Sequence, residues 1–270
     1  MPLTVSPPPT GSSRTVPPAP VAELNGVSAN DFSDRVRGPR IDLTTGLSSD
    51  DDALIVGLIS AAEGDDDPSL LLVDDLLDDA TAEQLSESLK ALGATGATGE
   101  ITKVPAPAAL PVGLVVSVGL GAAANLDDAE AVRQAAGTAI RAVDGSARVV
   151  STLSAAGVGP AAEGSYLGAY RFDETRSDKS RSAKRPPATV LLAVDAKTKQ
   201  DKAELDHALI VADSVAIARD FVNTPPNILF PAEFAERARV LASKAGLRVE
   251  ILDEVELAKG GYGGIIGVGQ

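Results

Sequence analysis

The sequence contains no cysteine and no tryptophan, and a single histidine stands among its 270 residues. Without cysteine the chain can form no disulfide, no thiolate metal site and no cysteine nucleophile. Five phenylalanines and three tyrosines are too few to supply the stacking platforms of a single-stranded nucleic-acid binder. The one histidine, His207, has no partner nearby in the sequence for a metal site or a nucleophile-activating base. We interpret His207 as a solvated residue on a charged helix face.

Positive charge and long apolar runs are also scarce. The chain carries 38 acidic and 24 basic residues, a formal net charge of −14. Phosphate backbones and anionic membranes require clustered lysine and arginine, so neither is an expected partner. The basic loop Arg176–Arg185 leaves a local contact with DNA open as an alternative. The longest apolar runs, such as Ala53–Ile59, are of strand length and too short to span a membrane. These features predict a soluble cytoplasmic protein.

The N-terminal segment is rich in proline, serine and threonine. It has neither the continuous apolar core of a signal peptide nor the repeated arginines of a transit peptide. A composition of this kind is typical of chains that do not fold by themselves. We therefore expect residues 1–40 to form a disordered tail.

Short apolar runs alternate with helical patterns from there to residue 196. Several of the runs are apolar throughout, which is typical of strands buried on both faces. Good helix start and stop signals lie between them, such as the capping pair Thr81 and Gln84 with Gly93 at the end. Strands that alternate with helices predict an α/β domain with a largely parallel sheet. The expected strands are Ala53–Ser60, Ser69–Val73, Glu100–Val104, Val112–Val118, Arg148–Ser154 and Thr189–Val194.

A double proline interrupts the helical pattern near the C-terminal end. Lys199–Val222 reads as one long helix, and the segment that closes it is RDFVNTPPN, residues 219–227. Two consecutive prolines remove two backbone donors and favour an extended Thr224, so the helix must end here. Taken alone, this segment is a rigid elbow. Pro231 then begins another helix, and strands are expected at Leu247–Leu252 and within Gly260–Gln270.

Three other patterns are candidate sites. Gly119-Leu-Gly121-Ala-Ala-Ala124 fits a dinucleotide-binding turn, but the next predicted strand lacks the acid that would bind a ribose. A tight strand-to-helix turn, with weak anion binding as an option, explains it better. Glu163, Tyr166 and Tyr170 lie at helical spacing, and packing against the sheet explains them. The acidic runs do not have the spacing of a calcium loop and indicate solubility; they are Asp50–Asp52, Asp65–Asp67, Asp74–Asp75 and Asp78–Asp79.

Two of these segments together resemble a known family. RDFVNTPPN, followed by Pro231 at a helix start, resembles the segment that joins the two domains of the leucyl (cytosol) aminopeptidases, the M17 metallopeptidase family. EGSYLGAYRFDETRSD, from Glu163, resembles a helix-and-loop motif near the end of that family's N-terminal domain. The closing GGYGGIIGVGQ resembles the beginning of the catalytic domain. VGLG, residues 118–121 after a predicted strand, recurs at the corresponding place in the family's N-terminal domain. The resemblance extends over roughly Leu47–Gln270.

The resemblance implies a division of the chain and an activity. Residues 41–196 would form a macro-domain-like α/β domain, 197–225 an interdomain helix and joint, and 226–270 the start of a two-metal α/β catalytic domain. Members of the family are hydrolases that use two divalent ions, commonly manganese or zinc, to release N-terminal amino acids, often leucine, from peptides. They are cytoplasmic and usually assemble as hexamers.

The resemblance also implies where the chemistry is missing. The family's metal ligands and catalytic residues all follow the point where this sequence ends. We therefore expect no catalytic, metal-binding or cofactor-binding residue in this chain. The two ions would be bound outside it. This portion would serve folding, domain orientation and oligomer assembly, and alone it would be inactive, as a truncated product or one piece of a cleaved subunit.

A non-catalytic module is the alternative. A macro-domain-like fold with the turn at Gly119–Gly121 would offer backbone donors to an anion or to an ADP-ribose-like ligand at a helix N-terminus. A ligand-dependent rise in melting temperature would distinguish this reading from the aminopeptidase one.

Overall fold

The computed structural model describes residues 29–63, 67–177 and 184–269. The chain divides into two compact units. The first, called here the sheet unit, is Val36–Thr224. The second, called here the helical unit, combines the segment before Val36 with the segment after Thr224. The helical unit is thus built from two parts of the chain that are far apart in the sequence.

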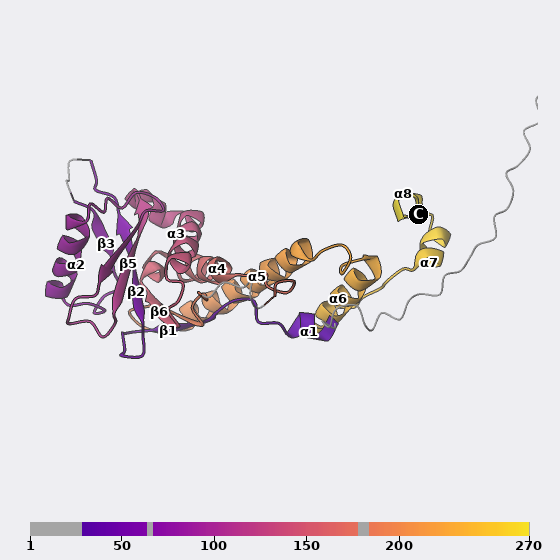
Figure 1. The fold of residues 1–270 in the computed structure, drawn as a ribbon, viewed down its shortest axis with the longest axis horizontal. Coiled ribbons are helices and arrows are strands. Elements are labelled where there is room, and N and C mark those ends of the chain that lie inside the picture. Colours follow the sequence, from indigo (N-terminus) through magenta and orange to yellow (C-terminus); the bar gives the residue numbers. More distant parts are fainter. Residues whose placement is uncertain (1–28, 64–66, 178–183, 270) are drawn as a thin grey trace, which may run out of the picture. The chain divides into compact units, whose positions relative to one another are not determined.

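One mixed sheet organises the sheet unit, with the strand order β1-β7-β6-β2-β5-β4 and β3 paired with β2 (Figure 1). The β2–β5, β2–β6, β6–β7 and β1–β7 pairs are parallel, and β3 and β4 are antiparallel to their neighbours. The prediction of a largely parallel sheet is therefore confirmed. The strands are β1 (Arg40–Thr44), β2 (Ala53–Ile59), β3 (Ser69–Leu71), β4 (Ile101–Pro105), β5 (Leu114–Gly121), β6 (Arg148–Ser151) and β7 (Thr189–Ala193).

All six strands predicted before residue 196 are present, with ends shifted by a few residues. The strand that the sequence reasoning missed is β1, a short edge strand whose five residues alternate between exposed or half-buried and buried. A strand with one exposed face carries polar residues at about every second position, so the apolar content of the sequence did not predict β1.

The helices lie between the strands and after them. The sheet unit contains α2 (Asp79–Ala91), η1 (Ala123–Asp127), α3 (Ala129–Ala142), η2 (Leu153–Ala156), α4 (Val158–Ala169) and α5 (Lys199–Asn223). The helical unit contains α1 (Ala29–Asp34), α6 (Pro231–Lys244), α7 (Glu254–Lys259) and α8 (Gly263–Gly269). The N-cap of α2 is Asp78, whose carboxylate accepts from the Thr81 amide, so the helix begins earlier than the Thr81–Gln84 pair predicted.

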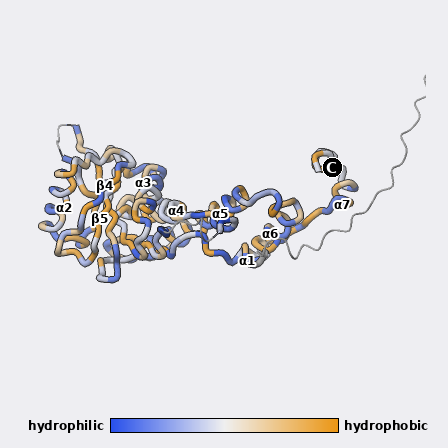
Figure 2. The backbone as a smooth tube through the Cα atoms, in the orientation of Figure 1, coloured by the Kyte–Doolittle hydropathy of each residue, from blue (hydrophilic) through white to orange (hydrophobic). Residues whose placement is uncertain are grey.

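Both faces of the sheet are covered, which explains why β2 is apolar throughout. Ala53 and Ile55 belong to one hydrophobic cluster, which also contains residues of α3, α4 and α5. Leu54, Val56 and Leu58 belong to a second cluster, which also contains residues of α2. Successive side chains of a strand point to opposite faces, so a strand between two layers must be apolar at every position. Apolar stretches of the backbone accordingly gather in this part of the chain (Figure 2).

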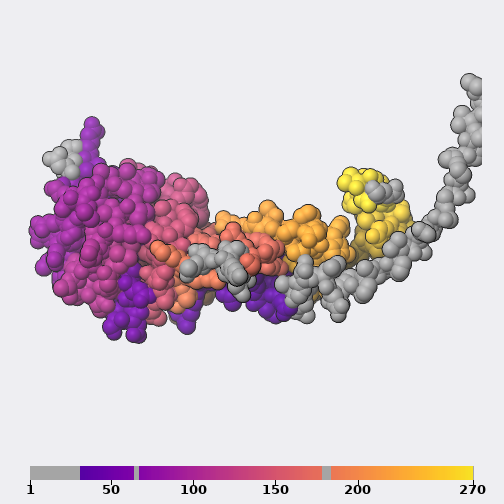
Figure 3. Space-filling model, in the orientation of Figure 1, coloured from indigo at the N-terminus to yellow at the C-terminus, as the bar shows by residue number. Residues whose placement is uncertain are grey.

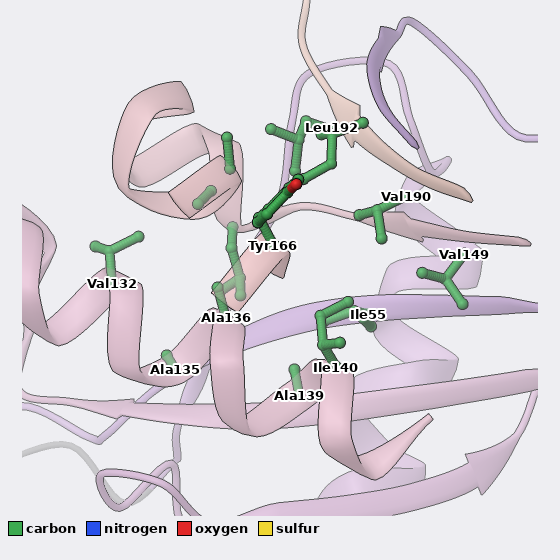
Figure 4. Close-up of a cluster of buried hydrophobic side chains, with 14 of the residues drawn as sticks. Ile55, Val132, Ala135, Ala136, Ala139, Ile140, Val149, Tyr166, Val190 and Leu192 are labelled. Carbon is green, nitrogen blue, oxygen red and sulfur yellow. The ribbon is translucent and has the colours of Figure 1, made fainter. Parts of the chain in front are cut away.

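Small residues let α3 and α4 approach closely. Figure 4 shows Ala135, Ala136 and Ala139 of α3 beside the buried aliphatic side chains of the sheet. A Cβ atom at Gly168 of α4 would lie 2.6 Å from the Cα atom of Gly137 in α3, and one at Gly164 would overlap the Arg133 carbonyl oxygen. Side chains at these positions would push the helices apart, because packed interiors have no room for extra methyl groups.

The helical unit differs from expectation in two places. Residues 247–253 are irregular, and α8 lies in the stretch Gly260–Gln270 where the second strand was expected, so both strand predictions are wrong. A strand requires a neighbour for its backbone hydrogen bonds, and no strand occurs among residues 29–35 and 225–269. A capping box of Asp253 and Glu256 instead satisfies the first amides of α7 locally.

The expected tail is shorter than predicted. Of residues 1–40, those from 29 onward contain α1 and the first residue of β1, so the prediction is wrong for that stretch. Residues 1–28 lie outside the described part of the chain. None of the helices in the described ranges is both long enough and apolar enough to cross a membrane.

Candidate functional site

The two segments that carry the family resemblance meet in the sheet unit, where α4 packs against α5. Tyr166 on α4 donates a hydrogen bond to Asp213 Oδ1 on α5 at 2.8 Å. Tyr170, the C-cap of α4, donates to Asp220 Oδ1 at 2.8 Å. Tyr166 also belongs to the core cluster, as predicted, but its hydroxyl has a second task that sequence spacing did not show. The two tyrosines, which are about one helical turn apart in the sequence, therefore join the helices by polar contacts.

Asp220 is the centre of this arrangement, and its side chain is completely buried. Its Oδ2 accepts from Arg37 Nε at 2.7 Å, and the Arg37 side chain is only 1% exposed. An isolated buried carboxylate would be costly, so Asp220 and Arg37 depend on each other and on the Tyr170 hydroxyl. Thr224 completes the helix end, because its hydroxyl donates to the Asp220 carbonyl oxygen at 2.6 Å. We call Arg37, Tyr170, Asp220 and Thr224 the joint cluster.

Other residues of RDFVNTPPN surround the joint cluster. The Asn223 amide donates to the Tyr170 hydroxyl at 3.2 Å, and the Arg219 guanidinium lies 5.6 Å from the centre of the Tyr170 ring. Thr224 is extended, with φ −70° and ψ 125°, as a residue before proline should be. The helix therefore ends where the double proline predicted. The structure also explains the other residues of the RDFVNTPPN motif. They secure the helix end to α4 and to the segment before β1.

The electrostatics of the contact between α4 and α5 suit a structural role. Burial, together with the hydrogen bond to Asp213, raises the pKa of Tyr166 well above its ordinary value. Tyr166 therefore stays protonated and remains a donor throughout the physiological range. No pair of a nucleophile and a base lies among the joint cluster residues, and the Asp220 carboxylate is occupied by two donors. Chemically, the arrangement can hold the end of α5 in place.

The backbone amides at the end of β5 are hydrogen-bonded within the protein. The amides of Gly119 and Gly121 donate to the carbonyl oxygens of Glu100 and Gly96, both at 2.8 Å. Gly121 has a φ of +76°, and a Cβ atom there would lie 2.5 Å from the Thr98 hydroxyl. A Cβ atom at Gly119 would overlap the Ala97 carbonyl oxygen. Both glycines lie in β5 and not in the turn that was predicted for them. They serve close backbone packing, and these two amides are not available to an anion.

The acidic runs have mixed roles. Asp51 is buried and forms an ion pair with Arg148 at 2.7 Å, and Asp52 accepts from the Arg148 amide. Asp78 caps α2, and Asp67 pairs with Lys90. Solubility is therefore too simple an account of these residues, several of which tie loops to the sheet. Asp65 and Asp66 lie outside the described residues, as do residues 178–183 of the basic loop.

His207 lies on the exposed side of α5, part of which is at the surface in Figure 3 (orange), as predicted. Across residues 29–63, 67–177 and 184–269, no three histidine, aspartate or glutamate side chains are grouped so that they could hold a metal ion.

Comparison with known proteins identifies the family of this chain. The model for the cytosol aminopeptidase family, N-terminal domain, matches residues 55–179, and the model for its catalytic domain matches residues 216–270. The chain belongs to the cytosol aminopeptidase family. The motif from Glu163 to Asp173 lies in the first match and RDFVNTPPN lies in the second, so the resemblance stated from those motifs is confirmed.

The curated relatives are longer than this chain. A probable cytosol aminopeptidase of Rhodococcus jostii is 46% identical over 239 residues, which are 87% of this chain and 46% of the relative. One of Nocardia farcinica is 48% identical over 245 residues, 88% of this chain and 48% of the relative. The chain thus spans about half the length of the curated relatives that it matches.

Solved structures show the same fold. The bottromycin maturation enzyme BotP is 25% identical with a TM-score of 0.56, over 77% of this chain and 41% of that chain. A mutant of tomato leucine aminopeptidase has a TM-score of 0.58 at 20% identity, over 84% of this chain and 46% of that chain. The α/β fold class predicted from the sequence is confirmed.

Proposed function

We propose that this chain is the N-terminal portion of a metal-dependent aminopeptidase, which releases N-terminal amino acids, preferentially leucine, from peptides. The observation that carries the proposal is the order of the two family matches: the N-terminal domain at 55–179 is followed by the catalytic domain at 216–270. The relatives named above as probable cytosol aminopeptidases support the same activity.

The parent enzyme would use two divalent ions, manganese or zinc. The bottromycin maturation enzyme BotP, which resembles this chain in fold, has been solved in complex with Mn. The described residues of this chain do not fit such a centre, because no suitable group of three acidic or histidine side chains occurs among them. We therefore assign no ligand and no catalytic step to the described residues, and the family resemblance is the basis for proposing that the ions are bound outside this chain.

This portion would serve folding, domain orientation and oligomer assembly, with a cytoplasmic homo-hexamer as the expected assembly. The joint cluster supports the orientation role. It fixes the end of α5, the last element before the double proline, through an ion pair that is almost inaccessible to solvent. A rigid helix end is what a joint between an accessory domain and a catalytic domain requires.

Hydrolysis of a leucine substrate tests the proposal in two parts. The parent protein should hydrolyse leucine p-nitroanilide when Mn²⁺ is present and lose that activity on chelation. The purified 270-residue chain should show no turnover with or without Mn²⁺. A parent protein that is inactive with every divalent ion would refute the aminopeptidase assignment. Metal-dependent turnover by the short chain alone would instead refute the placement of the active site outside it.

A further inference from the structure

The segment before β1 lies outside both family matches, yet it is secured at both of its ends. We call Ala29–Arg37 the strap. Its first part is α1, which packs against α6 within the helical unit. Phe32 of α1 is 1% exposed, and the Arg237 guanidinium of α6 lies 4.6 Å from the centre of its ring. An aromatic ring that is buried against a cation in this way is a specific anchor.

Polar contacts add to the Phe32 anchor. The Lys244 ammonium, in the last turn of α6, donates to Ser33 Oγ at 2.6 Å and to Asp34 Oδ1 at 2.5 Å. The partners are 211 and 210 residues apart in the sequence. Contacts over such a separation cannot arise from local chain preference, so α1 is bound to α6 by specific recognition.

The other end of the strap is anchored in the sheet unit. Arg37 forms the buried ion pair with Asp220 at the end of α5, at a sequence separation of 183 residues. Between the two anchors stands Val36, whose surface is 85% exposed. The strap is therefore secured at Phe32 in one unit and at Arg37 in the other, with an exposed residue between the anchors.

The position of the anchors matters because the chain passes between the units twice, at Arg35–Val36 and at Thr224–Pro225. Arg37 is two residues from the first crossing. Its partner Asp220 shares a hydrogen bond with Thr224 at the second crossing. The joint cluster thus holds together, within the sheet unit, the points where both crossings leave it.

We propose that the strap is a tether, which keeps α1 on α6 and so stabilises α6 and the residues that follow the NTPP joint. The chain that carries α1 is also anchored at Arg37, two residues after the end of the helical unit's first segment. An intact strap therefore raises the effective concentration of α1 at α6. The inference rests on contacts within each unit, and it holds whether or not the parent protein is an aminopeptidase.

Hydrogen exchange in the complete 270-residue chain tests the strap directly. A protease recognition sequence inserted between Arg35 and Val36 allows the strap to be cut after folding, at a place where the side chain is exposed. Cutting should accelerate amide exchange in α6 and in residues 225–230 by about tenfold or more, while amides of β2 and β5 keep their rates. Unchanged exchange in α6 after complete cutting would show that α1 only decorates it, and would overturn the proposal.

Point variants give the same test without an insertion. Phe32→Ala should accelerate exchange in α6 in the same direction as cutting, and Phe32→Tyr, which keeps the ring, should restore slow exchange. Arg239→Ala is the matched control on the same helix, because Arg239 pairs with Glu236 within α6 and is 48% exposed. Equal acceleration by Arg239→Ala, or acceleration spread over the whole sheet unit by Phe32→Ala, would contradict a restraint that acts through the strap.

Discussion

The sheet unit and the helical unit use apolar residues differently. In the sheet unit they fill two clusters, one on each face of the sheet. In the helical unit, the buried side chains among the described residues are Phe32, Arg237 and Val240. Large apolar side chains are exposed there instead, namely Phe230, Phe234, Leu247, Ile251, Val255, Tyr262, Ile265 and Val268. An apolar pattern therefore yields a core only where distant segments bring their apolar faces together, and stability should depend mainly on the sheet unit.

The largest expected effect contrasts one apolar residue from each unit. Leu205 of α5 is fully buried, so Leu205→Ala should lower the free energy of unfolding by about 2–5 kcal/mol. Phe234 of α6 is 50% exposed, and Phe234→Ala should change it by about 0.5 kcal/mol or less. Urea denaturation followed by circular dichroism measures both. Comparable losses of unfolding free energy in the two variants would show that the helical unit has a core of its own, which would contradict the difference between the two units.

A second pair of variants sharpens the contrast inside the sheet unit. Gly164→Ala places a methyl group against the Arg133 carbonyl of α3 and should cost about 1–3 kcal/mol of unfolding free energy. Gly159→Ala, on the same helix, meets nothing within 4 Å and should be neutral or stabilising by up to about 1 kcal/mol. Thermal unfolding of the two variants distinguishes close packing from a general effect of alanine in α4. If both variants were equally stable, α3 and α4 would not be in close contact.

The smallest effect concerns the polar contact between α4 and α5. Tyr166→Phe removes the hydrogen bond to Asp213 and should cost about 1 kcal/mol at neutral pH. The folded-state pKa of Tyr166 is raised, chiefly by burial, above the value of about 10 for an unfolded tyrosine. Its stabilising contribution is therefore complete below that pH and is lost as the pH rises toward the folded-state pKa.

Melting temperatures between pH 7 and 11 check this pH dependence. The difference between the unsubstituted protein and Tyr166→Phe should be largest up to about pH 9 and should shrink above about pH 10. The other tyrosines titrate in both proteins and cancel in the difference. A constant difference across the range would mean that Tyr166 ionises as readily in the folded state as in the unfolded state.

Much of the fold was predictable because its signals are local. The apolar runs predicted six of the seven strands, and the double proline predicted the end of α5. Glycines past the ends of α2 and α6 adopt a positive φ at Gly93 and Gly246, as helix stops do. Each of these features depends on a few neighbouring residues, so a single sequence carries it.

The failures share a different cause. Strands were expected at Leu247–Leu252 and in Gly260–Gln270, but the described part of the helical unit contains no strand with which they could pair, and an apolar pattern alone does not supply one. Arg37 was assigned to a tail because its partner, Asp220, lies 183 residues later. The polar task of Tyr166 and Tyr170 was missed for the same reason, since helical spacing does not reveal a carboxylate on another helix.

The sequence by itself determined the alternation of strands and helices, the break at the double proline and the motifs that mark the family, since all of these are written in consecutive residues. Only the tertiary structure explains why the motif contains Asp220. It places Arg37 and Tyr170 on one buried carboxylate, and burial makes each of these groups depend on the others. The segment whose prolines end α5 is therefore also the place where the sheet unit holds both of the segments that lead to the helical unit.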